Sequence, residues 1–480
     1  MKVQGLLMVA GLAATFAAPA SAAEPVSRDE VRSIVAEMMA DAESRSTLQG
    51  GGTAGYDKGF FLASSDNKFR LNISGYTQFR YTANFQDQNN TAGGADTFSN
   101  GFNVRRAVLD FSGNAGSEDL TYRVRILQNG DGASGNGDFN IEDAWAAYGL
   151  GGGWKVRAGQ FRTMFWKENN NADINTMATD RSIVDSAFGQ DFSQGVGVIF
   201  NSDQIDFNLD FTDGIGSARN RLFSADRSST TTFNTTNGAG AFTSVTTSEA
   251  ADWAVSGRAE YTFAGDKNQL KDYTSAQDEK FAGNVGIGGF FQQSANNGTA
   301  NVTPPTNTQI VNNLTGFTID AQVEGNGFGA FVGGVGTIRD FRSAGNDVGT
   351  LNDYGFLAQV NFRVLPKTDI FARYELLGID NDHGAPLGGS VTATESQKYY
   401  QFITAGVTQY IVGTHTKLTV DAVFALNRTA SDANTQRLDG TGNVIGNPGL
   451  NQGPSGNTIG LFGSNRGIEV ALRAQLQVAF

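Results

Sequence analysis

The sequence predicts an all-β protein: a 16-stranded antiparallel transmembrane β-barrel with a short N-terminal helical, coiled-coil-like segment. Three observations predict this fold class. Apolar and polar residues alternate with a period of two in many segments after Phe60. No apolar stretch beyond the N-terminal leader reaches the ~20 residues that a spanning helix requires. Short and long connections alternate along the chain, as they do in bacterial outer-membrane barrels.

The first 22 residues have the anatomy of a secretory signal peptide. Lys2 precedes an apolar run from Val3 to Ala18, and the small residues 20–22 follow. The competing interpretation is a membrane anchor, but the run is short and no stop-transfer pattern follows it. We therefore expect residues 1–22 to be removed and the mature chain to begin near Ala23.

Residues 27–48 are expected to form a periplasmic helix, a possible coiled coil. Ser27 is suited to the N-cap and Glu30 to the capping-box position. An apolar stripe with alternating spacings of four and three supports a coiled coil: Val31, Val35, Met38 and Ala42. The alternative is a solvated leader.

The Gly50–Gly52 run after this helix predicts a flexible linker over 49–59. The barrel is expected over 60–480.

The alternation is clear in the first and last barrel segments. Between 69 and 85 the apolar side chains fall on odd positions, and between 468 and 480 on even positions. Alternation alone also fits a soluble sandwich, so the connections have to decide. We expect turns near 112–118, 150–153, 202–204, 264–281, 325–327, 365–367 and 413–415. We expect long loops near 86–101, 128–139, 161–193, 212–251, 292–313, 337–353, 377–398 and 427–465.

Eight loops and seven turns give sixteen strands with both termini on the periplasmic side. The composition agrees, because 61 Gly, 35 Phe and only 8 Pro suit aromatic-faced strands joined by turns. The chain has no Cys, which excludes disulfides and thiolate metal sites. Its net charge of −13 argues against a nucleic-acid partner. No cofactor is expected.

Charged residues within strands fall almost entirely on the inward phase, as they must if the other face meets lipid. Arg105 is the clear exception, at a strand end. The strand over 140–149 is ambiguous, because the neighbours Glu142 and Asp143 cannot both point inward. The basic residues gather in the first five strands. We expect these pore-lining bases: Arg70, Arg80, Arg106, Arg123, Arg125, Lys155 and Arg157.

The third long loop, 161–193, supplies a second set of candidate site residues. The set consists of Arg162, Lys167, Glu168, Asp173, Asp180, Arg181, Asp185 and Asp191. If the loop folds into the barrel, its acids face the basic wall across a constriction and create a transverse field. The alternative is a solvated external loop.

An enzyme built into a barrel is a competing function. The only histidines are His383 and His415, expected at opposite rims, so a shared Ser/His/acid site is disfavoured. Asp380 and Asp382 lack the regular ligand spacing of a calcium loop. We therefore expect no catalytic, cofactor or metal residues.

Several stretches resemble the phosphate-selective porin O and P family. They are YDKGFFLASSDNKFRLNISGYTQFRY, VRRAVLDFSG, IEDAWAAYG with KVRAGQFRTMF, TAGVTQYIVGTHTKLTVD and LRAQLQVAF, between Tyr56 and Phe480. The resemblance implies a sixteen-stranded trimeric porin with an inward-folded third loop. Two positions depart from the family pattern. Met164 stands where such proteins often have Pro after GQF. DFSQGVGV lacks the Arg that is often found before the Gly that begins the following strand.

Together these features predict an outer-membrane porin. The expected function is passive diffusion of small hydrophilic solutes and ions past the third loop. A phosphate- or anion-specific porin is the alternative, and a structural or anchoring barrel is a second one. The expected partners are outer-membrane lipid, two further copies of the chain in a homotrimer, and the barrel-assembly machinery, which we expect to recognise the C-terminal strand.

Overall fold

The computed structural model describes most of the region predicted to form the barrel. It covers residues 52–57, 59–86, 97–129, 139–190, 192–214, 228–233, 243–248, 251–294, 298–301, 309–343, 346–378, 399–427 and 469–480, with Ser33 and Glu37. By its contacts the chain divides into residues 1–52 and residues 53–480. The second unit contains the sheet described below.

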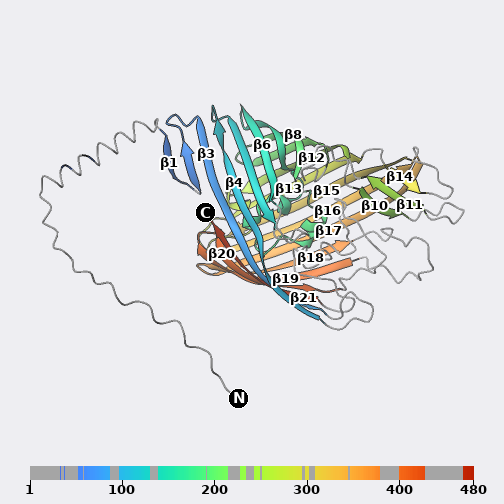
Figure 1. Cartoon of the computed structure of the whole chain (residues 1–480). Helices are drawn as coiled ribbons and strands as arrows, with labels where there is room; N and C mark the ends of the chain where they lie inside the picture. Colours follow the sequence, from blue (N-terminus) through green and yellow to red (C-terminus); the bar gives the residue numbers. More distant parts are fainter. Residues whose placement is uncertain are drawn as a thin grey trace, which may run out of the picture. The chain divides into compact units, whose positions relative to one another are not determined.

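Sixteen strands pair antiparallel in a closed ring, which confirms the predicted barrel (Figure 1). In ring order they are β3 (Phe69–Gln86), β4 (Thr97–Ala115), β5 (Leu120–Asn129), β6 (Phe139–Gly151), β7 (Trp154–Arg162), β8 (Phe192–Asn201), β9 (Ile205–Thr212), β12 (Ala251–Ala264), β13 (Ala282–Ser294), β15 (Gln309–Gly325), β16 (Phe328–Ser343), β17 (Asn346–Leu365), β18 (Thr368–Gly378), β19 (Tyr399–Val412), β20 (Thr416–Ala425) and β21 (Glu469–Ala479).

The ring closes between its first and last strands. β21 pairs with residues 76–86 of β3, so that Gln475 lies opposite Arg80. Beyond this ladder, Phe480 and Gly75 exchange two backbone hydrogen bonds of 3.0 and 3.1 Å. Closure matters because lipid offers no partner to the backbone groups of an open sheet edge.

The connections follow the predicted alternation with one exception. The seven turns lie where they were predicted, at one end of the barrel, which we call the turn end. The loop predicted at 337–353 is wrong, because β16 and β17 continue as a hairpin to Ser343 and Asn346. Its Gly, Asn and Asp residues suggested a loop, but a strand segment outside the bilayer does not require apolar residues. The long connections also contain β10 (Ser228–Phe233), β11 (Thr243–Ser248) and β14 (Gly298–Asn301).

A small hairpin precedes the barrel. β1 (Thr53–Tyr56) pairs with β2 (Phe60–Ala63), which pairs with the start of β3. The predicted linker over 49–59 is therefore wrong for 53–56, where strand pairing replaces a flexible chain. Residues 1–22 and almost all of 27–48 lie outside the described residues; Ser33 and Glu37 are helical and exposed. None of the helices in the described ranges is long and apolar enough to cross a membrane.

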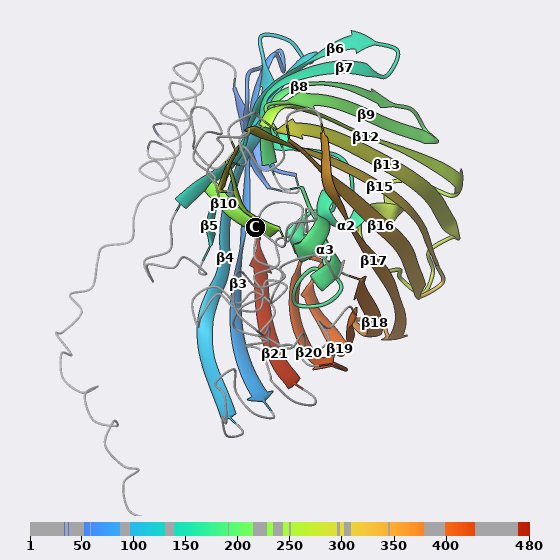
Figure 2. The same ribbon diagram turned by 90° about the vertical axis from the view of Figure 1, so that its right-hand side faces the viewer.

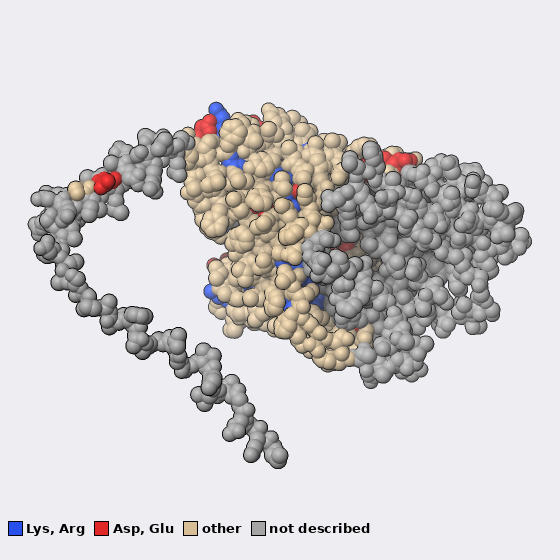
Figure 3. Space-filling view, viewed as in Figure 1, with Lys and Arg blue, Asp and Glu red and all other residues tan. Residues whose placement is uncertain are grey.

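The two faces of the ring differ as the alternation predicted. Most of the described surface in Figure 3 carries no charged side chain. Many large apolar side chains of the strands are exposed, among them Phe79, Phe102, Leu209, Phe211, Ile287, Phe317, Ile319, Val360, Val407, Val420 and Leu472. The inward positions hold most of the buried charged side chains. The barrel therefore presents an apolar exterior around a hydrophilic interior, with the third loop inside it.

The closure depends on the absence of a side chain at Gly75. A Cβ there would lie 2.4 Å from the Val108 carbonyl oxygen and 2.7 Å from the Phe480 ring. We expect Gly75→Val to lower the free energy of unfolding by about 1–3 kcal/mol through overpacking. The measurement is the temperature at which samples heated before electrophoresis lose the band of the folded barrel. Gly101→Val is the matched control, because no atom lies within 4 Å of a Cβ there; equal loss in both variants would contradict this account.

Candidate functional site

The third loop runs from Thr163 to Asp191 and lies within the ring of strands (Figure 2). It contains α2 (Lys167–Asn170), the 3₁₀ turn η1 (Asp173–Asn175) and α3 (Ile183–Phe188). Ser182 caps α3, since its hydroxyl accepts a hydrogen bond from the Asp185 backbone N–H. Most residues of the loop are buried, which confirms that it folds inward and excludes the solvated external loop.

Apolar contacts seat the loop on the inner wall formed by β13 to β18. The Phe165 ring packs edge-on against Phe290 at 4.8 Å, and Trp166 packs edge-on against Phe331 at 6.0 Å. Side chains of α3 join the same buried cluster. Burying aromatic and aliphatic side chains of this size contributes roughly 1.5–3 kcal/mol each. The loop is thus anchored by a hydrophobic core of its own.

Glycines on the wall make room for this core. A Cβ on Gly333 would lie 2.7 Å from the Trp166 ring, and one on Gly355 would lie 2.8 Å from Val184. A Cβ on Gly288 would lie 2.6 Å from the Phe165 carbonyl oxygen. Any side chain at these three inward positions would push the loop away from the wall. The strand sequence and the loop sequence therefore fit each other.

Polar contacts hold the middle of the loop to β18 and β20. Asp421 of β20 accepts a hydrogen bond of 3.0 Å from the Thr179 backbone N–H. Lys417 donates to the Thr176 carbonyl at 2.7 Å, and Glu375 of β18 accepts from the Ile183 backbone N–H. These wall groups satisfy backbone polar atoms that a buried loop would otherwise leave unpaired.

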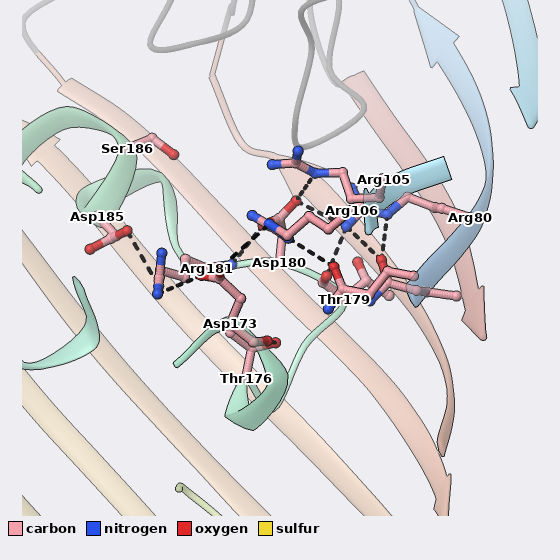
Figure 4. A network of polar contacts seen from close by, with 12 residues as sticks. Arg80, Arg105, Arg106, Asp173, Thr176, Thr179, Asp180, Arg181, Asp185 and Ser186 are labelled. Atoms are coloured by element: carbon pink, nitrogen blue, oxygen red, sulfur yellow. Dashed lines mark hydrogen bonds and ion pairs between the residues drawn. The ribbon is translucent and has the colours of Figure 1, made fainter. Parts of the chain in front are cut away.

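Asp180 lies at the centre of an arginine cluster (Figure 4). Its two carboxylate oxygens accept from Arg80 of β3 at 2.9 Å and from Arg105 and Arg106 of β4, each at 3.0 Å. All four side chains are nearly inaccessible to water. Burial alone would raise the pKa of this loop carboxyl, but Arg105, Arg106 and Arg80 hold the pKa of Asp180 well below its usual range.

Asp173 forms a second contact between the loop and the basic wall. Its carboxylate lies 3.4 Å from Arg125 and 3.7 Å from Arg106, and it also pairs with Arg181 of the loop. The Tyr76 hydroxyl donates to the same carboxylate at 3.3 Å. From the sequence we expected these acids to face the arginines of the basic wall across a constriction. That geometry is wrong for Asp173 and Asp180, which touch the arginines directly.

Two β-bulges explain the apparent exceptions to the charge pattern. Gln78 lies opposite Arg106 and Phe79 opposite Val104, so Arg105 is an extra residue in β4 and also points inward. Likewise Glu142 is extra in β6, because Arg125 lies opposite Asp143 and Ile126 opposite Ile141. Each bulge brings two neighbouring charged residues to the inner side. The expectation that Arg105 points outward is therefore wrong, and so is the expectation that Glu142 and Asp143 cannot both point inward.

The remaining candidate residues are spread over the barrel. Arg123 pairs with Asp110, Arg157 with Asp210 at 2.9 Å, and Lys167 with Glu260 at 2.7 Å. Glu168 accepts hydrogen bonds from Ser182, and Arg181 lies 3.8 Å from Asp185. Arg162 donates to the Asn169 carbonyl. Arg70 and Lys155 lie toward the turn end and are more accessible to water than Arg80 or Arg106. Asp191 lies outside the described residues.

The sequence missed several members of the site. Arg105 was expected to point outward and the phase of Glu142 was left ambiguous, although two adjacent charges in one strand are a recognisable signal of a bulge. His415 lies in the turn at one rim, as expected, and its Nε2 lies 3.1 Å from Asn175 Oδ1 in the loop. Burial and, to a lesser degree, Lys417 lower the pKa of His415. Among the residues with a described position, no group of acids and histidines could hold a metal ion.

A closed barrel with an apolar exterior, a charged interior and a loop folded into it is the architecture of an outer-membrane pore. The family model of phosphate-selective porin O and P matches residues 76–374, more than half of the chain. The chain belongs to this family; it is a porin of the outer membrane and forms a channel for small solutes.

Solved structures with a similar fold are also porins or outer-membrane channels. An anion-selective porin from Comamonas acidovorans has 12% identity and a TM-score of 0.46, with 85% of this chain and 99% of that chain covered. The outer-membrane channel DcaP of Acinetobacter baumannii has 13% identity and a TM-score of 0.45, with 85% and 97% covered. No curated protein sequence matches the chain.

The seating of the third loop can be tested at Trp166, which is fully buried. We expect Trp166→Ala to weaken the docking by about 3–5 kcal/mol, since a cavity replaces the indole against Phe331. Single-channel recordings should then show a larger and noisier conductance. Trp154→Ala is the control, because that indole packs on Phe200 and is 43% exposed on the outer face. A quiet, unchanged channel in Trp166→Ala would contradict the docking.

Proposed function

We propose that this porin admits small hydrophilic solutes and ions by passive diffusion, and that the third loop sets the narrowest part of the path. The supporting observation is that the loop contacts both sides of the barrel: Phe165 and Trp166 pack on one side, and Asp173 and Asp180 pair with the other. A segment fixed at opposite sides reduces the open cross-section without blocking the barrel by itself.

The ion pairs bear on selectivity. Within the described residues, five arginines and four carboxylates are joined at the basic wall: Arg80, Arg105, Arg106, Arg125 and Arg181 with Glu142, Asp173, Asp180 and Asp185. The small positive excess favours a mild preference for anions. A phosphate- or anion-specific channel is the alternative, supported by the arginines that gather around Asp180.

Asp180 is the residue through which selectivity can be tested. Asp180→Asn removes the negative charge that three arginines share, so the local field becomes more positive. We expect the chloride-to-potassium permeability ratio to rise roughly twofold or more. The measurement is the reversal potential of a planar bilayer across a KCl gradient, repeated with phosphate as a competing anion.

Two comparisons make the result interpretable. Asp66→Asn removes an equal charge from the exposed turn before β3, where Asp66 pairs with Lys68 at 3.4 Å, and it should leave the permeability ratio unchanged. Strong block of the wild-type current at low phosphate would favour the phosphate-specific alternative. An unchanged reversal potential in Asp180→Asn would rule out Asp180 as a determinant of selectivity.

A purely structural or anchoring barrel is the remaining alternative. It would insert into bilayers without well-defined conductance steps, whereas the proposed channel gives discrete steps. We propose as well that the pore-lining bases and the loop charges set selectivity, and that β21 contacts the assembly machinery.

We further propose that the porin is a homotrimer and that residues 27–48 join three copies in a coiled coil. The support is the apolar stripe through Val31, Val35 and Met38. Deleting 27–48 should reduce the trimer fraction after detergent extraction, as measured by light scattering. Exchanging the same three residues for Ser tests the stripe without shortening the chain. A trimer unchanged in both variants would overturn the coiled-coil role.

A further inference from the structure

The connection between β12 and β13, residues 265–281, differs from the other turns of the barrel. The β15–β16 turn needs only residues 326–327, and β8–β9 only 202–204. Ala264 and Gly283 already lie opposite each other in the ladder, so a few residues would suffice to join them. The additional chain contains the 3₁₀ turn η2 (Gln269–Lys271). This extra length is not required by the sheet.

The connection folds against the inner wall. Leu270, Tyr273 and Ser275 are buried. The Tyr273 ring packs edge-on against Phe331 at 5.3 Å, on the same ring that receives Trp166 of the third loop. Phe331 follows the turn at 326–327 by only a few residues and points inward. The connection therefore enters the lumen from the turn end and lies next to the third loop.

The wall has a recess for this segment as well. A Cβ on Gly329 would lie 2.7 Å from the Tyr273 carbonyl oxygen. Gln322, an inward residue of β15, donates to the Asp272 carbonyl. At the rim, the backbone N–H groups of Asn326 and Gly327 donate to the carbonyls of Glu279 and Ala276 at 2.9 and 2.8 Å. The segment is thus held by backbone, side-chain and ring contacts.

The connection and the third loop also touch each other. Asn175 of η1 donates from Nδ2 to the Lys271 carbonyl at 3.1 Å, while its Oδ1 lies beside His415 in the β19–β20 turn. Gln477 of β21 donates to the neighbouring Ile174 carbonyl at 3.1 Å. The third loop therefore reaches the turn end, where the two segments lie side by side in the part of the lumen next to β13 to β21.

Water-accessible charges mark the side that stays open. At the edge of the connection, Lys267 pairs with Asp206 of β9 at 2.6 Å, and these side chains are 21% and 31% exposed. Arg123 of β5 is 32% exposed at the side chain. In contrast, Asp320, Asp369 and Glu375 on the β15 to β18 side are almost completely buried.

The geometry points to a second constriction, formed by residues 265–281 at the periplasmic exit and separate from the narrowing by the third loop. It confines leaving solutes to the side of β4 to β9, where they pass the Lys267–Asp206 pair and Arg123. Both signs of charge lie at this exit, so it limits solute size more than it selects the sign of ions. The inference rests on the proposed channel function.

Shortening the connection tests the inference. In the full-length porin, residues 266–280 are replaced by Asn-Gly, a pair suited to a tight hairpin turn. We expect single-channel conductance in KCl to rise roughly twofold, with little change in the chloride-to-potassium permeability ratio. An unchanged conductance in a folded variant would overturn the second constriction.

A single-cysteine variant provides an independent test should the shortened chain fail to fold. The chain has no Cys, so a thiol reagent acts only at the introduced site. Lys267→Cys treated with a trimethylammonium methanethiosulfonate should lose roughly one third of its conductance, because the adduct adds bulk at the exit. Asp203→Cys, in the neighbouring exposed turn, is the control and should keep its conductance.

The outcomes separate the two proposals. If the wild-type porin gives no conductance steps, the channel function itself fails. Labelling of Lys267→Cys is verified by mass spectrometry. If the wild type conducts and the labelled Lys267→Cys variant keeps its conductance, only the proposal of a second constriction fails. Equal loss in Lys267→Cys and Asp203→Cys would also overturn it, because the effect would then not depend on position in the lumen.

Discussion

The constraint on which the structure depends is that lipid supplies no hydrogen-bond partner to the backbone. A sheet in lipid therefore has to close, and here β21 pairs with β3 up to Phe480 and Gly75. Closure then fixes which side chains face lipid and which face the lumen. Because the outer face cannot carry many charges, acids and bases are concentrated inside, where they bind the third loop. The charged site is in this sense a consequence of closing the sheet.

The period of two made the barrel predictable, and it also set the limit of the prediction. Strand number, turn positions and the inward phase of residues such as Arg80 and Arg106 follow from alternation and connection length alone. Arg105 and Glu142 do not, because a bulge adds one residue and reverses the phase locally. The extension of β16 and β17 beyond the membrane was missed for a related reason: without lipid, the pattern that identifies a strand is lost.

The docking of the third loop needed information that lies in two distant parts of the sequence. Phe165 and Trp166 are unusual in a loop that is otherwise largely polar, and glycines at 333 and 355 occupy inward positions where other strands carry side chains. Neither feature alone indicates a contact. Only the fold shows that the wall glycines face the loop's apolar side chains. The same holds for Gly329 and Tyr273 in the β12–β13 connection, which the sequence identified only as a longer turn.

Direct pairing between the loop and the wall changes how charge acts in this pore. Acids held across a water-filled gap from arginines would produce a strong transverse field. Asp173 and Asp180 instead neutralise the arginines at contact distance, so their main effect is to fix the loop in place. Burial of a charge is tolerated only with a partner, and removal of either partner leaves an uncompensated buried charge. The loop position and the net charge of the lumen are therefore set by the same ion pairs, and a substitution such as one at Asp180 alters both together.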